Sequence, residues 1–217
     1  MKHLIIIGAG GFGREVYSTA LESIDYGVEY VVKGFIDDNV HALDAFEGYP
    51  PILDTIDNYQ PQDTDVFACA VGDVRTRRIL SEKIMSKGGV FQTLIHKTAY
   101  IGKNAKVGDG CIILAGARIH CDVTVGKHVI IQPYSILGHD VNVGNWTLIN
   151  ALADCGGMSK VGEMVTLHTT SFILPQSIIE DGATVGAGSV VLRKVKAGMT
   201  VMGVPAKPVL TPGMKKK

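Results

Sequence analysis

The residues of this chain that are best placed for acid–base chemistry are a histidine and an aspartate that are adjacent in sequence. Of the seven histidines, His139 alone is followed by an acidic residue, Asp140, and it is preceded by Gly138. A neighbouring carboxylate orients an imidazole and stabilises its protonated form, so we expect this pair to act as a general base. The other histidines of the second half are expected at solvated turns: His120, His128 and His168.

A glycine-rich segment near the start of the chain has the composition of a phosphate-binding turn. Residues 8–13 read Gly-Ala-Gly-Gly-Phe-Gly, a GxGxxG pattern, between an apolar run at 4–7 and a stretch at 14–23 that we expect to be helical. Glycines let the backbone approach a phosphate, and the helix start offers unpaired N–H groups to its charge. In this position the pattern favours a nucleotide or nucleotide sugar near Gly10, Gly11 and Phe12.

Two further strands are expected to end near this turn. Residues 30–36 are followed by Asp37 and Asp38, whose carboxylates can accept hydrogen bonds from ribose hydroxyls or a base. Residues 65–71 are followed by Gly72 and then by Asp73, the expected N-cap of a helix over 74–88. That helix carries Arg75, Arg77 and Arg78, one of which is expected to contact a phosphate while the other two face solvent.

The order of these elements predicts a small, mostly parallel sheet. A fourth apolar stretch at 91–95 completes a βαββαβ pattern, and such sheets bind ligands at the carboxyl ends of their strands. The segment is only about half as long as a full dinucleotide-binding domain, so NAD is the less favoured ligand.

The elements that must position the histidine pair are set by a six-residue repeat. From Ala99 to Lys194 the chain divides into sixteen hexads without insertion or deletion; position three is Ile, Val or Leu in fifteen of them and Cys155 in the other. A helical period cannot keep position three on one face, whereas short strands can if three hexads close a coil of 18 residues. The repeat therefore predicts a parallel β-helix of a little over five coils, with position three inside.

Small residues and glycines of the repeat fit this reading. Position one is Ala, Ser, Thr, Val or Cys throughout, which suits the remaining interior of a narrow prism. Glycine follows position three in eight hexads, where we expect the chain to turn tightly. Acetyl transfer also needs a donor for the oxyanion of its intermediate. Gly157 lies 18 residues after His139, one coil along, so its backbone N–H is expected to face the same groove.

Composition excludes several classes of function. The 21 basic and 21 acidic residues balance, so no net field favours nucleic acid or an acidic membrane. No apolar run is long enough for a signal peptide or a membrane span. The four cysteines lack CxxC spacing and are expected to be reduced thiols in a cytoplasmic protein, and residues 215–217, three lysines, are expected to be a solvated tail.

Four segments, GAGGFGREV, TLIHKTA, SILGHDVNVG and MGVPAKPV, together resemble the hexapeptide-repeat sugar acetyltransferases of the bacterial sialic-acid, perosamine and bacillosamine pathways. The resemblance extends over essentially the whole chain. It implies a Rossmann-like domain over 1–96 that holds a nucleotide-linked amino sugar, and a left-handed β-helix over 97–217 with a C-terminal tail. It also implies a homotrimer with acetyl-CoA between neighbouring prisms, working in surface-polysaccharide or glycan synthesis.

The same resemblance implies a role for each candidate residue. His139 is the general base, Asp140 raises its basicity, and the acetyl group passes directly to an amino or hydroxyl group with no acyl-enzyme and no metal. Contacts to the sugar nucleotide are expected at Gly10, Gly11, Phe12, Asp37, Asp38, Gly72 and Arg75. Contacts to acetyl-CoA are expected at Gly157, Thr169 and Ala187.

Two features of the sequence keep other functions open. Relatives often carry a histidine where this chain has Leu148, and residues 168–170, His-Thr-Thr, replace a glycine-rich corner. These departures allow a scaffold that binds nucleotide sugar or CoA without catalysis. A metal-dependent carbonic anhydrase on the same prism is the other alternative, although its histidine pair five residues apart is missing: His139 has Gly144 and His120 has Val125 at that spacing.

Overall fold

The computed structural model describes residues 1–209, which form two compact units. Unit 1 comprises Met1–Lys97 and Asp109–Ile113, and unit 2 comprises Thr98–Gly108 and the chain from Leu114 onward. The first segment of unit 1 thus ends one residue beyond the expected boundary at residue 96. The three lysines expected to form a solvated tail lie outside the described residues.

Unit 1 is built on a five-stranded parallel sheet of order β3-β2-β1-β4-β5. Its strands are β1 (Lys2–Ile7), β2 (Tyr30–Ile36), β3 (Ile52–Asp54), β4 (Asp65–Cys69) and β5 (Val90–Phe91). The apolar run of β1 is buried because this strand lies between β2 and β4. The predicted parallel sheet is confirmed; β3 was missed because its three residues are too few for a pattern.

Two helices follow the strands that carry the candidate nucleotide residues. Helix α2 (Val74–Ser86) begins as predicted, because Oδ1 of Asp73 accepts a hydrogen bond from Thr76 N at 2.8 Å. Helix α1 (Gly11–Leu21) starts three residues earlier than expected, and its N-cap, Gly10, provides no side-chain acceptor. The first N–H groups of α1 are therefore not capped by a side chain.

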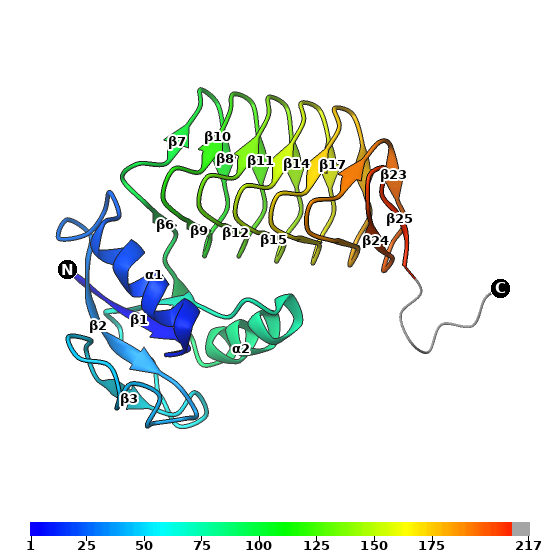
Figure 1. The fold of residues 1–217 in the computed structure, drawn as a ribbon. Helices are drawn as coiled ribbons and strands as arrows, with labels where there is room; N and C mark the ends of the chain where they lie inside the picture. The colour runs from blue at the N-terminus through cyan, green and yellow to red at the C-terminus, as the bar shows by residue number, and fades with distance from the viewer. Residues whose placement is uncertain (210–217) are drawn as a thin grey trace. The chain divides into compact units, whose positions relative to one another are not determined.

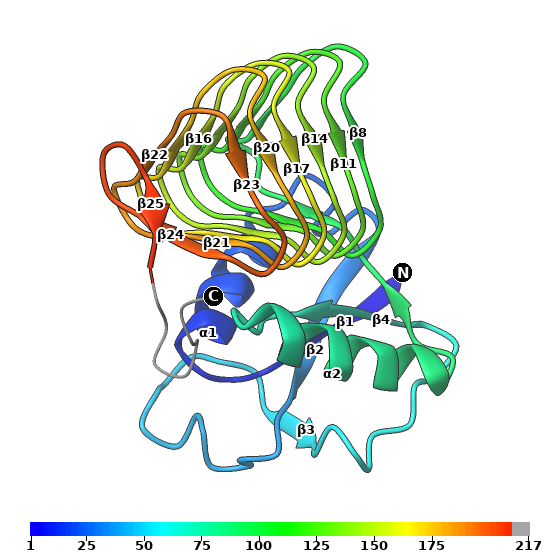
Figure 2. The same ribbon diagram turned by 90° about the vertical axis from the view of Figure 1, so that its right-hand side faces the viewer.

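Strands β6 to β24 form a left-handed parallel β-helix with three faces, whose stacked coils are seen in Figure 1 and almost end-on in Figure 2. The first face contains β7 (Tyr100–Ile101), β10 (Arg118–Ile119), β13 (Ile136–Leu137), β16 (Asp154–Cys155), β19 (Phe172–Ile173) and β22 (Val190–Val191). The second contains β8 (Lys106–Val107), β11 (Thr124–Val125), β14 (Asn142–Val143), β17 (Lys160–Val161), β20 (Ile178–Ile179) and β23 (Lys194–Val195).

The third face is the longest. It contains β6 (Leu94–Ile95), β9 (Ile112–Ile113), β12 (Ile130–Ile131), β15 (Leu148–Ile149), β18 (Thr166–Leu167), β21 (Thr184–Val185) and β24 (Thr200–Met202), with β25 (Lys207–Pro208) antiparallel at its end. We call the turn from the first to the second face the first corner, the next the second corner, and the turn from the third to the first face the third corner.

The predicted interior of the prism is confirmed over most of its length. From Ile113 to Val191 every position-three residue is at most 3% exposed. The exceptions are in the first coil, where Ile101 is 37% exposed and Val107 is only partly buried. Pairs such as Arg118↔Ile136 and Ile136↔Asp154 keep the 18-residue register from coil to coil. This register fixes which residues lie above one another at each corner.

The glycines that follow position three do not have the role in turning the chain that the sequence predicted. The left-handed turn lies at position six, where residues such as Asp140 and Met158 have φ near +60°, and not at the glycines after position three. Those glycines are required by the spacing of the coils: a Cβ on Gly144 would lie 2.5 Å from the backbone of Gly162. The expectation of a tight turn at these glycines was wrong by two residues.

Both ends of the repeat differ from the hexads read in the sequence. The repeat starts one hexad earlier, because β6 pairs with β9 in the 18-residue register, so the segment 91–95 is two strands and not one. At the other end β23 pairs with β20 at a spacing of 16, since Ile178 is opposite Lys194. The corner after β22 is two residues shorter, and each of the first two faces has six strands.

Candidate active site

The first corner places the histidine–aspartate pair at the edge of the prism. Buried Leu137 anchors the end of β13, and Gly138 then carries the chain out to His139 and Asp140. Nδ1 of His139 lies 2.7 Å from Oδ2 of Asp140, and both side chains are half exposed. The carboxylate can only accept, so Nδ1 carries the proton and Nε2 keeps its lone pair. This is the arrangement of a general base.

The imidazole ring of His139 lies over Gly157, one coil along. A Cβ on Gly157 would lie 2.6 Å from Nε2 and 2.8 Å from Cε1 of the imidazole. The ring therefore occupies space that a larger residue at position 157 would take. The main chain connects the same two coils, since Met158 N donates to His139 O at 2.9 Å. His139, Asp140 and Gly157 are thus brought together as the sequence predicts.

The expected contacts at Thr169 and Ala187 lie at a different corner. Both residues are exposed at the third corner on successive coils, where Gly188 N donates to Thr169 O at 3.0 Å. The first face separates this corner from Gly157 along each coil. Within one chain the structure therefore brings Thr169 and Ala187 together and leaves Gly157 apart from them. Leu148, one of the two departures noted in the sequence, is 7% exposed.

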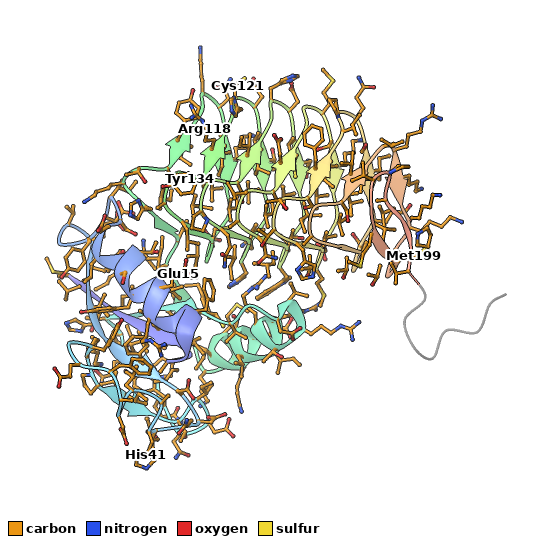
Figure 3. All side chains as sticks on the ribbon, in the orientation of Figure 1. Glu15, His41, Arg118, Cys121, Tyr134 and Met199 are labelled. Carbon is orange, nitrogen blue, oxygen red and sulfur yellow. The ribbon has the colours of Figure 1, made fainter. Side chains whose placement is uncertain are left out.

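Two residues near the first corner add to its surroundings. Cys121 is exposed at this corner one coil earlier, labelled in Figure 3, and its carbonyl accepts from Asp140 N. His120 is partly buried against the edge of the Tyr100 ring. The expectation of a solvated turn was wrong for His128, which is 5% exposed because its ring stacks on Trp146 with centroids 4.0 Å apart.

In unit 1 the glycine turn, Asp37 and Gly72 lie at the carboxyl ends of neighbouring strands. Gly8 N donates to Ile36 O, and a Cβ on Gly8 would lie 3.3 Å from Ala70 O, so the turn after β1 is close to the ends of β2 and β4. A Cβ on Gly10 would meet nothing within 4 Å. Gly10 thus leaves open space beside the start of α1, as a phosphate-binding turn requires.

The carboxylate of Asp37 holds the glycine turn in place by hydrogen bonds. Its Oδ2 accepts from Ala9 N at 2.7 Å and its Oδ1 from Asn39 N at 2.8 Å, so one carboxylate joins the glycine turn to the loop after β2. Asp38 is exposed, and its Oδ1 accepts from Ile56 N at 3.1 Å. Each oxygen retains a lone pair, so both residues can still accept from a ligand hydroxyl.

The sequence missed the roles of two arginines near this edge. Arg77 is 1% exposed, and its Nη1 donates to the carbonyls of Val71 and Gly72 at 3.0 and 3.2 Å, which fixes the loop after β4. Burial lowers the pKa of Arg77 to about 10. Arg14, in the first turn of α1, lies 3.6 Å from the centre of the Phe46 ring. Arg75, the sequence candidate, is exposed.

Other kinds of site were also considered. Within residues 1–209 no three His, Cys, Asp or Glu side chains are grouped as metal ligands would be. In the same residues, neither helix has the length and apolar character of a membrane span. All four cysteines are free thiols, and burial raises the pKa of Cys69 to about 11 and that of Cys155 to about 12.

Comparison with known proteins finds similarity to sugar N-acetyltransferases. Residues 3–84 match the family model of the PglD N-terminal domain. The chain is 28% identical over 215 residues to the GDP-perosamine N-acetyltransferase of Escherichia coli O157:H7, covering 93% of this chain and 94% of that protein. It is 30% identical over 119 residues to the UDP-N-acetylbacillosamine N-acetyltransferase of Bacillus subtilis strain 168, covering 53% of this chain and 52% of that one.

A solved structure shares the complete fold. The acetyltransferase domain of PglB from Neisseria gonorrhoeae FA1090, in complex with acetyl coenzyme A, has a TM-score of 0.87 and 29% identity. The match covers 96% of this chain and 99% of that one. Both the sheet unit and the left-handed prism are therefore present together in that acetyltransferase domain.

Proposed function

We propose that the chain, which is similar to sugar N-acetyltransferases, transfers the acetyl group of acetyl-CoA to an amino group of a nucleotide-activated sugar. The observation that carries the proposal is the geometry of His139. Its Nδ1 is occupied by Asp140 at 2.7 Å, and its Nε2 lies over a glycine that leaves room for it. An acetyltransferase needs a base in this state.

The reaction is a direct transfer. The amine nitrogen attacks the thioester carbon, and Nε2 of His139 takes a proton from that nitrogen as the new C–N bond forms. The tetrahedral intermediate then collapses, the C–S bond breaks, and the proton is returned to the sulfur of CoA. Asp140 stabilises the imidazolium in between. The backbone N–H of Gly157, which has no backbone acceptor among the described residues, supports the oxyanion.

The nucleotide part of the acceptor is assigned to unit 1. The open space at Gly10 and the uncapped start of α1 suit a diphosphate, with Gly11 and Phe12 alongside. The remaining lone pairs of Asp37 and Asp38 suit hydroxyls of the ribose, and Gly72 and Arg75 border the same edge. Arg77 has a positioning role, because it holds the carbonyls of Val71 and Gly72.

The CoA site is assigned to two corners, which requires more than one prism. Gly157 is at the first corner, whereas Thr169 and Ala187 are at the third, so we assign acetyl-CoA to a position between corners of neighbouring copies. A homotrimer provides such positions. Light scattering is expected to give three times the mass of the chain; a monomer that is active at assay concentration contradicts this part of the proposal.

The function is tested by a thiol-release screen. The protein is mixed with acetyl-CoA and a panel of nucleotide amino sugars that differ in base and in the position of the amine. We expect rapid thiol release with at least one member and a product heavier by one acetyl group. No release with any amino sugar, together with saturable CoA binding, would instead support the non-catalytic scaffold. The free thiols suit a reaction in the reducing cytoplasm.

A further inference from the structure

The reaction described above leaves one carboxylate near the first corner without a role. Asp154 is the first residue of β16, on the same coil as Gly157. Successive side chains of a strand point to opposite sides, and Cys155 is fully buried, so the side chain of Asp154 points outward. Its partners in register on the neighbouring coils are Ile136 and Phe172. The carboxylate thus lies in the middle of the first face with an apolar side chain on either side.

This carboxylate is partly desolvated and has no cation bound to it. Burial raises the pKa of Asp154, and the electrostatic interaction with His120 opposes that effect only in part. No hydrogen bond or ion pair within residues 1–209 ends on the Asp154 side chain, and Arg118, labelled on the same face in Figure 3, is two coils earlier. A carboxylate in such surroundings costs free energy that a bound cation would recover.

The corner residues between Asp154 and His139 are glycines. Gly156 follows Asp154 by two residues, about 6.7 Å along a strand. Gly157 is the next residue and lies under the His139 ring. Gly138 occupies the position of Gly156 on the preceding coil, and Gly138 N donates to Cys155 O at 2.8 Å. A small group placed on this glycine strip would therefore be close to both the carboxylate and Nε2.

We propose that Asp154 binds the amino group of the acceptor sugar and holds it beside Nε2 of His139. The inference rests on the proposed function and names the feature of the acceptor that is recognised. Near pH 7 a sugar amine is largely an ammonium ion, which forms charge-assisted hydrogen bonds to a carboxylate. The ammonium then loses one proton to water, and the neutral amine remains hydrogen-bonded to Asp154. The second proton leaves through His139 to the CoA sulfur as the C–N bond replaces the C–S bond.

A consequence is selection of amines over hydroxyls. A hydroxyl on the same sugar carbon offers one weaker donor and no charge, so the desolvated carboxylate would remain uncompensated. Asp154 thus directs the enzyme to N-acetylation, while His139 alone would serve either acceptor.

The test is Asp154→Asn, which keeps the shape and removes the charge. We expect KM for the nucleotide amino sugar to rise about 10–100-fold, as for loss of a charged hydrogen bond. KM for acetyl-CoA and kcat should change less than about threefold. Asp181→Asn is the matched control, because Asp181 is at the second corner, where its oxygen accepts from Glu163 N and an amide oxygen can do the same. It should leave all three constants unchanged.

A binding measurement separates this inference from the proposed function. Calorimetry should show that the wild-type protein binds the amino sugar more tightly than the same nucleotide sugar with a hydroxyl, and that Asp154→Asn loses this preference. A wild-type KM in the variant, a rise in KM for acetyl-CoA instead, or a lower solution mass of the variant would overturn the inference. Absence of turnover by the wild-type protein would contradict the proposed function. The binding preference would still show whether Asp154 recognises the amino group.

Discussion

At the scale of residues, the chemistry depends on three groups held by two successive coils. Asp140 occupies Nδ1 of His139, which leaves Nε2 as the acceptor of a proton, and Gly157 provides the space in which Nε2 lies. Asp140 takes up the left-handed turn itself, at φ 59°, so its carboxylate is fixed by the corner and not by a separate loop. The base and its orienting partner are thus consequences of one turn of the repeat.

Gly157→Ala tests whether the position of Nε2 matters. The added Cβ would lie 2.6 Å from this atom, so the half-exposed ring must move away. Because displacements of about 1 Å cost up to about 100-fold in rate, we expect kcat to fall by 10–100-fold. Stability should be unchanged, since the ring can shift into solvent. Cys121→Ala, at the same corner one coil earlier, is the control, and normal kcat in both variants would contradict the assignment.

At the scale of elements, glycines act by letting main chains approach. In the prism they let successive coils stack closely, as at Gly144 over Gly162. In unit 1 Gly13 has the same role, because its Cβ would lie 2.1 Å from Gly8 O and 2.9 Å from Gly8 C. Helix α1 can pack against the turn after β1 only without a side chain there. Gly10, with open space around its missing Cβ, is available for a ligand instead.

The two glycines of the phosphate turn should therefore respond differently to alanine. Gly13→Ala forces a main-chain shift, and we expect the free energy of unfolding to fall by about 2–4 kcal/mol. Gly10→Ala should alter stability by less than about 0.5 kcal/mol, because its φ of −69° suits alanine. Urea unfolding of both variants checks this. An equal decrease in the free energy of unfolding for both variants would contradict the close packing at Gly13 and the open space at Gly10.

How far the sequence predicts these elements depends on how regular they are. The hexads determine the prism, its buried row and the meeting of His139 with Gly157, because an 18-residue register follows from the period alone. The role of Asp154 could not be predicted, since it depends on which faces and glycines surround it. The hydrogen bonds of Asp37 and Arg77 were missed for a similar reason. Both side chains bond to main-chain atoms of other segments, which a sequence pattern does not reveal.

At the scale of the whole molecule, the two units are stabilised by different interactions. Unit 1 buries the carboxylate of Asp65, which accepts from Tyr59 Oη at 2.7 Å, Gln62 N at 2.9 Å and Lys33 Nζ at 3.0 Å. Unit 2 is held by a row of aliphatic residues with hydrogen bonds between coils. Loss of stability in unit 1 should therefore follow acid titration of Asp65.

Acid should weaken unit 1 through Asp65. Burial raises its pKa, but the hydrogen bonds from Tyr59, Gln62 and Lys33 outweigh this effect, so the pKa of Asp65 is below its usual value. The resulting stability is present above the unfolded pKa, about 3.9, and is lost as pH falls through the lower folded value.

The variant Asp65→Asn should lose about 2–4 kcal/mol at pH 7, because the charge of Lys33 is left without its partner. Urea unfolding of both proteins from pH 7 to 3 should show this difference shrinking only in the acid range. A difference that is the same at every pH would mean that packing, and not the charge of Asp65, is responsible.

The most direct test of the account is the turnover number of His139→Ala in thiol release, with acetyl-CoA and the best nucleotide amino sugar of the panel both saturating. We expect kcat to fall by about 10²–10⁴-fold, while calorimetric affinities for both substrates stay within a few-fold of the wild-type values. Wild-type turnover in this variant would show that the base lies elsewhere and would contradict the account.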